Sequence, residues 1–144
     1  MSAPLHFSGN NNYATPEYLY QALHMEFDFN LDPCPLNAVF NPEVDVDGLK
    51  LDWTDKRVFV NPPWSSITPW VQKGLNSKAQ VVVYVVPART DTQWFCDLKY
   101  SGAELRLFRK RVHFIREGVS ANPTDGTLVA IVYPKRELDG RKVE

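Results

Sequence analysis

The apolar run VVVYVV at positions 81–86 constrains the fold of this 144-residue chain more than any other feature. A strand that is apolar at every position presents no face to water, so other elements must cover it on both sides. The run has the length of a strand and falls far short of the ~20 residues that a membrane-spanning helix requires. It therefore predicts the centre of a parallel sheet between two layers of helices, in an α/β domain.

Helical and strand patterns precede this run. Thr15 as N-cap and Pro16 as the first helical residue predict a helix, along which apolar residues recur at helical spacing up to Phe27. Residues 27–32 then alternate apolar and polar side chains, which predicts a strand. Residues 33–56 show no clean period, and we expect a loop there, with room for a short helix or strand.

The same patterns continue around and beyond the run. The segment RVFVN at 57–61 predicts a buried strand, after which Thr68 and Pro69 repeat the cap and start of the first helix. A short helix capped by Thr90 or Asp91 should follow the central strand. Three further strands are predicted at 103–108, 111–115 and 127–133, the last two joined by a polar loop, which gives the sheet an antiparallel end.

Length and composition suit a single domain, residues 1–144, and we favour a monomer. The first residues lack a basic segment followed by an apolar one, so we expect a cytoplasmic protein and no membrane contact. Cys34 and Cys96 form no CxxC pair and are interpreted as reduced thiols. His6, His24 and His113 show no metal-ligand spacing, so we expect no metal site.

Three predicted strands end in polar, proline-containing segments: 32–35 (DPCP), 61–64 (NPPW) and 87–91 (PARTD). Ligands of open α/β sheets bind beyond the carboxyl ends of the strands, so we expect these segments to line one rim. At the third end, Arg89 and Asp91 are candidates to contact a substrate or to close the rim. Helix capping is the alternative role for Asp91.

The segment Asn61-Pro62-Pro63-Trp64, hereafter the tetrad, suits a planar substrate that carries an amino group. The Asn61 side-chain oxygen can accept one N–H of the amine, and the Pro62 carbonyl can accept the other. Proline fixes φ, so the loop is ordered before the substrate binds. Trp64 can stack on the ring of the substrate. The alternative is a proline-rich turn whose tryptophan packs in the core.

Charge is unevenly distributed along the chain. Residues 1–55 carry nine acidic residues and one basic residue, whereas residues 56–144 carry fifteen basic and eight acidic residues. The basic excess peaks in RLFRKRVHFIR at 106–116, which includes Arg109, Lys110 and Arg111. This segment is interpreted either as a phosphate-contacting edge for nucleic acid or as the solvated side of an antiparallel hairpin.

The tetrad resembles the (Asn/Asp/Ser)-Pro-Pro-aromatic motif of S-adenosylmethionine-dependent amino-methyltransferases. The order and spacing of further segments resemble the phage-type DNA N6-adenine methyltransferases, the Dam family of phages and prophages. The resemblance covers most of residues 13–133. Its other segments are Thr15-Pro16, Phe29 to Asp32, Asp47 to Trp53, and Val86 to Thr90.

The resemblance implies a compact, partly reduced Rossmann-like methyltransferase fold with no separate target-recognition domain. It implies that Asn61 and Pro62 bind the N6 amine of adenine in DNA, beside Pro63, and that Trp64 stacks on the flipped base. It also implies S-adenosyl-L-methionine as cofactor, and modification of phage or prophage DNA in the host cytoplasm as protection against host nucleases. The residues that it implies hold the cofactor are Thr15, Pro16, Asp32, Pro33 and Asp52, with Tyr13 as a residue that could cover a ligand.

Three functions therefore stay open. The first is a DNA N6-adenine methyltransferase. The second is a methyltransferase that uses the tetrad on another planar amine, such as guanine in RNA or a glutamine amide in a protein. The third is a nucleic-acid-binding module of the same fold without activity, which is considered because the DPCPLN turn after the first strand contains no glycine.

Overall fold

In the computed structural model, the apolar run forms the centre of a four-stranded sheet. The structure describes residues 14–34, 47–108, 112–116, 119–121, 126–134, 137–138 and 141–142. The run lies in β2 (Val81–Pro87), where all seven residues are buried. β1 (Arg57–Val60) pairs with β2 in parallel, and β6 (Thr127–Val132) pairs with its other side in antiparallel. β3 (Glu104–Leu107) completes the order β1-β2-β6-β3, so β6 alone runs against the others.

A short extended segment lies on the outer side of β1. Leu31 forms a parallel bridge with Val58, and the Phe59 N–H donates to the Leu31 carbonyl over 2.9 Å. The strand predicted at 27–32 is wrong in extent, because Phe27 still belongs to a helix and Asp28 adopts a left-handed conformation that ends it. The predicted alternation is confirmed, since Phe27 and Phe29 are buried while the polar residues between and after them are exposed.

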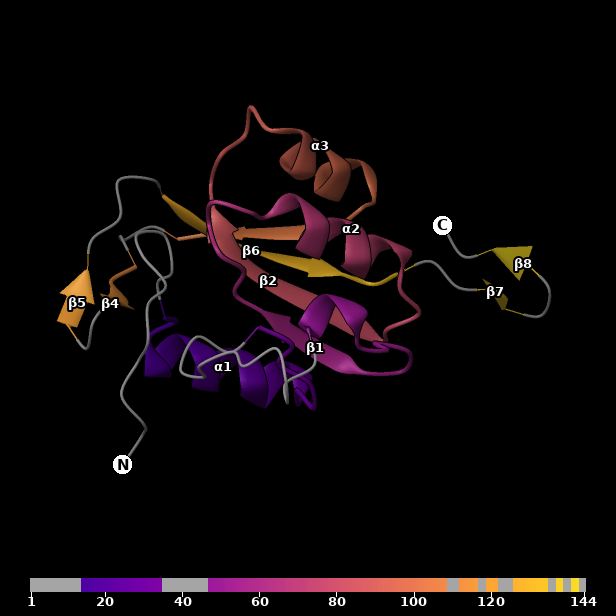
Figure 1. Cartoon of the computed structure of the whole chain (residues 1–144), viewed down its shortest axis with the longest axis horizontal. Helices are drawn as coiled ribbons and strands as arrows, with labels where there is room; N and C mark the ends of the chain where they lie inside the picture. The colour runs from indigo at the N-terminus through magenta and orange to yellow at the C-terminus, as the bar shows by residue number, and fades with distance from the viewer. Residues whose placement is uncertain are drawn as a thin grey trace.

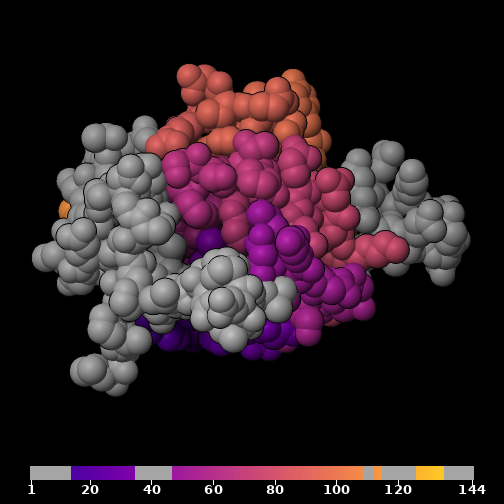
Figure 2. Space-filling view, in the orientation of Figure 1, coloured from indigo at the N-terminus to yellow at the C-terminus, as the bar shows by residue number. Residues whose placement is uncertain are grey.

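Helices cover both faces of the sheet, as the apolar run requires (Figure 1). α1 (Glu17–Phe27) lies on one face, and α2 (Thr68–Asn76) and α3 (Gln93–Tyr100) lie on the other. In the space-filling view, α3 forms the top of the molecule above α2 (Figure 2). Between the first extended segment and β1, the described residues 47–56 form a 3₁₀ turn, Gly48–Lys50, within the stretch where a loop with a short element was predicted.

The predicted helix starts are each displaced by one or two residues. The N-cap of α1 is Pro16 and not Thr15, and Thr68 is the first residue of α2 and not its cap. α3 is capped by Thr92, whose hydroxyl accepts from the Phe95 N–H, and not by Thr90 or Asp91. The hydroxyl of Thr15 is thus available for another contact.

The strand predicted at 111–115 does not join the main sheet. β4 (Phe114–Arg116) instead pairs with β5 (Val119–Ala121) in a separate antiparallel hairpin. β5 lies within the stretch predicted as a polar loop. Near the end of the chain, β7 (Glu137–Leu138) pairs with β8 (Arg141–Lys142). The antiparallel end of the sheet is therefore made by β6 and β3 alone.

The core packs around β2 and tolerates little change in volume. Trp53, Trp70 and Trp94 are all buried. The Tyr84 hydroxyl donates to the Trp70 carbonyl over 2.8 Å, and a Cβ on Gly74 would lie 1.8 Å from that hydroxyl oxygen. Among the described residues, no helix has both the length and the apolar composition needed to cross a membrane.

Candidate active site

The three polar strand ends lie at one edge of the sheet. Because β1 and β2 are parallel and Leu31 pairs in parallel with Val58, the segments that follow them all leave at the same edge. A direct contact joins the second and third ends: Arg89 Nη1 donates to the carbonyl oxygen of Trp64 over 3.0 Å. The tetrad is thereby tied to the loop that follows β2.

Asn61 is the first residue after β1, and only 4% of its surface is exposed. Its Nδ2 donates over 3.0 Å to the hydroxyl oxygen of Thr15, at the start of α1. The two residues lie 46 positions apart, so the fold itself brings this pair together. The contact restrains the rotation of the amide, whose oxygen is buried in this structure.

The rest of the tetrad forms a closed turn. Pro62 is buried, as is Pro16 at the start of α1. The carbonyl oxygen of Pro63 accepts from the Ser66 N–H over 2.9 Å. Trp64 is 3% exposed, and its ring meets that of Phe114 edge-on, with the ring centroids 5.2 Å apart. In this structure the tryptophan packs in the core, against the β4–β5 hairpin.

Asp32 follows the extended segment beside β1. Its Oδ1 accepts from the Cys34 N–H over 3.2 Å, and its side chain keeps an exposed surface. Burial by the surrounding chain nevertheless raises the pKa of Asp32 to about 6, against the opposing effect of the Cys34 hydrogen bond. Burial, with the charges of Asp32 and Glu17, also raises the pKa of Tyr20, which places its phenol near Asp32.

Gly48 packs directly against the segment that follows Asp32. A Cβ at Gly48 would lie 1.9 Å from the Pro33 carbonyl oxygen, so only glycine fits there. The carbonyl oxygen of Gly48 also accepts from Trp53 Nε1 over 3.1 Å. Asp47 caps the 3₁₀ turn, and together with Asp32 and burial it raises the pKa of Cys34 to about 12.

The sequence analysis did not predict the surroundings of Tyr20, Cys34 and Gly48 in this region. The Asp-Gly-Leu segment marked Gly48 as a position of interest, but it did not identify Pro33 as its neighbour. The sequence places Tyr20 in an amphipathic helix and gives no sign that it lies near Asp32. That position depends on how α1 lies across the sheet.

Asp52 and Asp91, two other predicted site residues, show no contact with the residues above. Asp52 is exposed and accepts from the Thr54 N–H over 3.0 Å. Hydrogen bonds from Thr54, helped by the charges of Lys73 and Lys56, hold the pKa of Asp52 below its ordinary value. Asp91 is exposed. Tyr13 lies outside the described residues.

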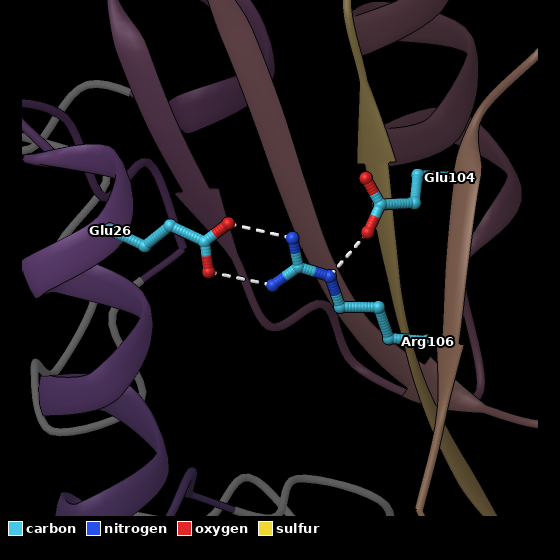
Figure 3. Close-up of polar contacts among 3 residues, drawn as sticks. All are labelled: Glu26, Glu104 and Arg106. Carbon is cyan, nitrogen blue, oxygen red and sulfur yellow. Dashed lines mark hydrogen bonds and ion pairs between the residues drawn. The ribbon is translucent and has the colours of Figure 1, made fainter.

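The basic segment 106–116 divides into parts with different surroundings. Arg106, on β3, is held by carboxylates: it donates to both oxygens of Glu26 on α1, each over 2.6 Å, and to Glu104 (Figure 3). Its guanidinium also lies over the ring of Phe27. It therefore ties β3 to α1 and is not a phosphate contact in this structure. Arg109, Lys110 and Arg111 lie outside the described residues.

A shallow groove of about 350 Å³ lies at the opposite edge of the sheet. It is lined by the last turns of α2 and α3 and by Val132, whose partner Val82 is near the start of β2. A groove at the amino ends of the strands is far from the rim where α/β sheets bind their ligands. The tetrad, with Thr15, Asp32 and Arg89, is therefore the candidate active site.

Comparison with known proteins identifies a family. Residues 5–142 match the family model described as DNA N-6-adenine-methyltransferase (Dam). No curated protein and no solved structure matches the chain. The family match covers nearly the whole chain and favours the first of the three functions that the sequence left open. The chain therefore belongs to the Dam family of DNA N-6-adenine-methyltransferases and is a DNA adenine methyltransferase.

Proposed function

We propose that the enzyme takes S-adenosylmethionine as methyl donor and holds it at the rim formed by Thr15, Asp32 and Pro33, next to the tetrad. The donor carries an ammonium group, a carboxylate and an adenosine. The residues fit it: Asp32 offers a carboxylate for the ammonium, and the Thr15 hydroxyl can donate to a carboxylate. The close approach of Gly48 to Pro33 supports a shaped main-chain surface at this point.

The topology supports a reduced Rossmann-like fold for this purpose. Four segments run in the same direction toward the rim, namely the extended segment at Leu31, β1, β2 and β3, and one reversed strand, β6, lies between β2 and β3. Asp32 and Asn61 leave from neighbouring segments at the edge where ligands of such sheets bind. That arrangement would bring a cofactor on the first strand end and a substrate amine on the second within reach of each other.

The tetrad would then prepare the amine of adenine for attack. The Asn61 side-chain oxygen accepts one N–H of the N6 amine, and the carbonyl oxygen of Pro62 accepts the other. Two acceptors concentrate electron density on the nitrogen, and both are in place before the substrate arrives. When bound, S-adenosylmethionine supplies the electrophilic methyl group. The N–CH₃ bond would form as the S–CH₃ bond of the donor breaks, with the neutral thioether as leaving group, and the proton that the nitrogen loses would pass to water.

Trp64 is proposed as the surface on which the flipped adenine stacks. An enzyme that modifies a base inside a duplex must take it out of the stack. Trp64 is 3% exposed and meets Phe114 edge-on in this structure, so stacking of a base would require the neighbours of Trp64, Phe114 among them, to move. Stacking of a base on an aromatic ring is worth ~1–3 kcal/mol.

The single observation that carries the proposal is the hydrogen bond that holds the buried Asn61 amide at the end of β1. The test is mass analysis of nucleosides from DNA incubated with the protein and S-adenosylmethionine. Wild type should form N6-methyladenine, and Asn61→Ala should lower the rate by ~10²–10³ while cofactor affinity stays nearly intact. A folded Asn61→Ala protein that methylates at the wild-type rate would show that the tetrad is only a turn.

A further inference from the structure

We infer that Thr15 is a positioning residue for Asn61, which sets the amide with its oxygen toward the substrate amine. This inference rests on the proposed role of the tetrad. It assigns to Thr15 a task on the substrate side of the reaction, in addition to any contact with the cofactor.

The side-chain torsion that turns an asparagine amide is soft, so the backbone alone does not choose its direction. Asn61 has a fixed backbone, because it directly follows Val60, which is fully buried in β1. What remains to be fixed is the rotation of the amide, whose oxygen is buried in this structure and would be uncovered when the substrate enters. The Thr15 hydroxyl oxygen accepts from Nδ2 over 3.0 Å and thus holds the nitrogen end.

The direction of the amide decides whether the site can work. An amine that approaches the amide oxygen meets an acceptor, whereas an amine that approaches the NH₂ end meets two donors. By holding the nitrogen, Thr15 selects the first arrangement. Its own hydroxyl proton stays able to point to another acceptor.

The local structure gives Thr15 no other task. The sequence predicts that its hydroxyl caps α1, but the helix begins after Pro16 and makes no side-chain cap hydrogen bond. The Pro16 carbonyl oxygen accepts from the Leu19 and Tyr20 N–H groups over 3.1 Å, so the main chain starts the helix. A threonine at this position is therefore explained by its contact with Asn61 and not by the helix.

Thr15→Val and Thr15→Ser form a matched pair for the test. Valine keeps the shape and removes the acceptor, and serine keeps the acceptor. At saturating DNA and cofactor, Thr15→Val should methylate adenine about 10- to 100-fold more slowly, since small misplacements at a reacting centre have costs of that order. Thr15→Ser should keep most of the wild-type rate. In an Asn61→Ala background, Thr15→Val should cause no further loss, because it acts through Asn61.

Two measurements besides activity separate positioning from other roles. In NMR spectra, the signals of the Asn61 side-chain NH₂ group can be assigned by their absence in Asn61→Ala. These signals should shift, and their protons should exchange faster with solvent, in Thr15→Val but not in Thr15→Ser. Calorimetry with the demethylated cofactor product reports any contribution of Thr15 to cofactor binding. If Thr15→Val does not fold, Thr15→Ala takes its place.

The inference is overturned if Thr15→Val leaves the rate and the Asn61 signals unchanged. It is also overturned if the only effect is weaker cofactor binding, with the rate restored at saturation, because Thr15 is then a cofactor ligand alone. Failure of the proposed function looks different: wild type would not methylate adenine, or Asn61→Ala would be fully active.

Discussion

Arg89 Nη1 donates a hydrogen bond to the main-chain carbonyl oxygen of Trp64 over 3.0 Å, across 25 positions of sequence. The contact joins the loop after β2 to the last residue of the tetrad. Arg89 also begins the turn into α3, because its carbonyl oxygen accepts from the Thr92 hydroxyl over 2.7 Å. The guanidinium thus contacts the backbone of the tetrad, whereas the sequence predicted that Arg89 contacts a substrate or closes the rim.

Arg89→Met should therefore lower kcat for methyl transfer while leaving cofactor affinity unchanged. Methionine keeps much of the apolar stem but donates no hydrogen bond, so the tetrad loses a brace. We expect a loss of up to about 100-fold, the order seen when reacting groups are displaced by about 1 Å. The kcat of Arg89→Lys should lie between those of wild type and Arg89→Met, because an ammonium offers a donor without the fixed geometry of the guanidinium. Equal salt dependence of DNA binding in wild type and Arg89→Met would separate this role from a phosphate contact.

Asp32 should make cofactor binding depend on pH. Burial raises its pKa to about 6 in the free protein, and a bound ammonium would favour the ionised form. Affinity should thus be full above that value and fall by up to about tenfold per pH unit as the pH drops through it. Calorimetry across this range should give a sloping profile for wild type and a weak, flat one for Asp32→Asn.

The raised pKa of Asp32 also affects the stability of the fold. Cofactor affinity should increase with pH, whereas the contribution of Asp32 to stability should decrease. The folded protein holds a proton on Asp32 more tightly than the unfolded chain, whose value is near 3.8. Folding is therefore disfavoured by Asp32 increasingly as the pH rises from 3.8 to about 6, and fully above it. At pH values above 6, the thermal unfolding midpoint of Asp32→Asn should be higher than that of wild type. Below pH 3.8 the two midpoints should be the same. A lower midpoint at neutral pH would contradict the assignment.

Gly48→Ala should distort the cofactor rim. Its Cβ would lie 1.9 Å from the carbonyl oxygen of Pro33 and 2.9 Å from the Pro33 Cβ, so the main chain must shift. We expect a loss of about 1–3 kcal/mol in the free energy of unfolding, as for other overpacked positions, together with weaker cofactor binding. Gly126→Ala is the matched control, because its nearest neighbour, Ala88 Cβ, would be 3.9 Å away. Wild-type cofactor affinity in Gly48→Ala would remove Pro33 from the site.

Trp64→Leu and Trp64→Phe should separate the two roles of this side chain. Both are apolar and smaller than tryptophan, so both leave a cavity beside Phe114, but only phenylalanine offers a flat ring for stacking on a base. With cofactor product present, Trp64→Leu should bind DNA roughly 5- to 150-fold more weakly, which corresponds to the worth of base stacking. Trp64→Phe and Trp64→Tyr should retain much of the activity. Equal DNA binding by the Leu and Phe variants would leave Trp64 a core residue alone.

The sequence predicted the elements that local pattern determines. The apolar run at 81–86 required a covered central strand, and alternation at 27–32 identified which side chains point inward. What it could not predict depends on contacts between distant residues. The hydrogen bond from Asn61 to Thr15 spans 46 positions, and the local pattern of the strand predicted at 111–115 does not distinguish a separate hairpin from the main sheet. The start of α3 is displaced because Thr90, Asp91 and Thr92 are all residue types that can cap a helix.

The basic segment 106–116 provides the last prediction, because Arg106 and its neighbours should behave differently. The guanidinium of Arg106 is already engaged by Glu26 and Glu104, and its hydrogen bonds hold the pKa of Glu26 below the ordinary value. Arg106→Met should leave DNA affinity and its salt dependence unchanged. Because the ion pair is partly exposed, the free energy of unfolding should fall by no more than about 1 kcal/mol.

Arg109→Ala and Arg111→Ala, in contrast, remove side chains that the charge pattern assigns to phosphates. Each should weaken binding to all DNA sequences alike and reduce the slope of log affinity against log salt by about one unit. Titrations of one duplex at several salt concentrations, with Arg106→Met as the control, measure both effects. If all three variants keep the wild-type slope, the segment is the solvated side of a hairpin, and DNA is held elsewhere on the rim.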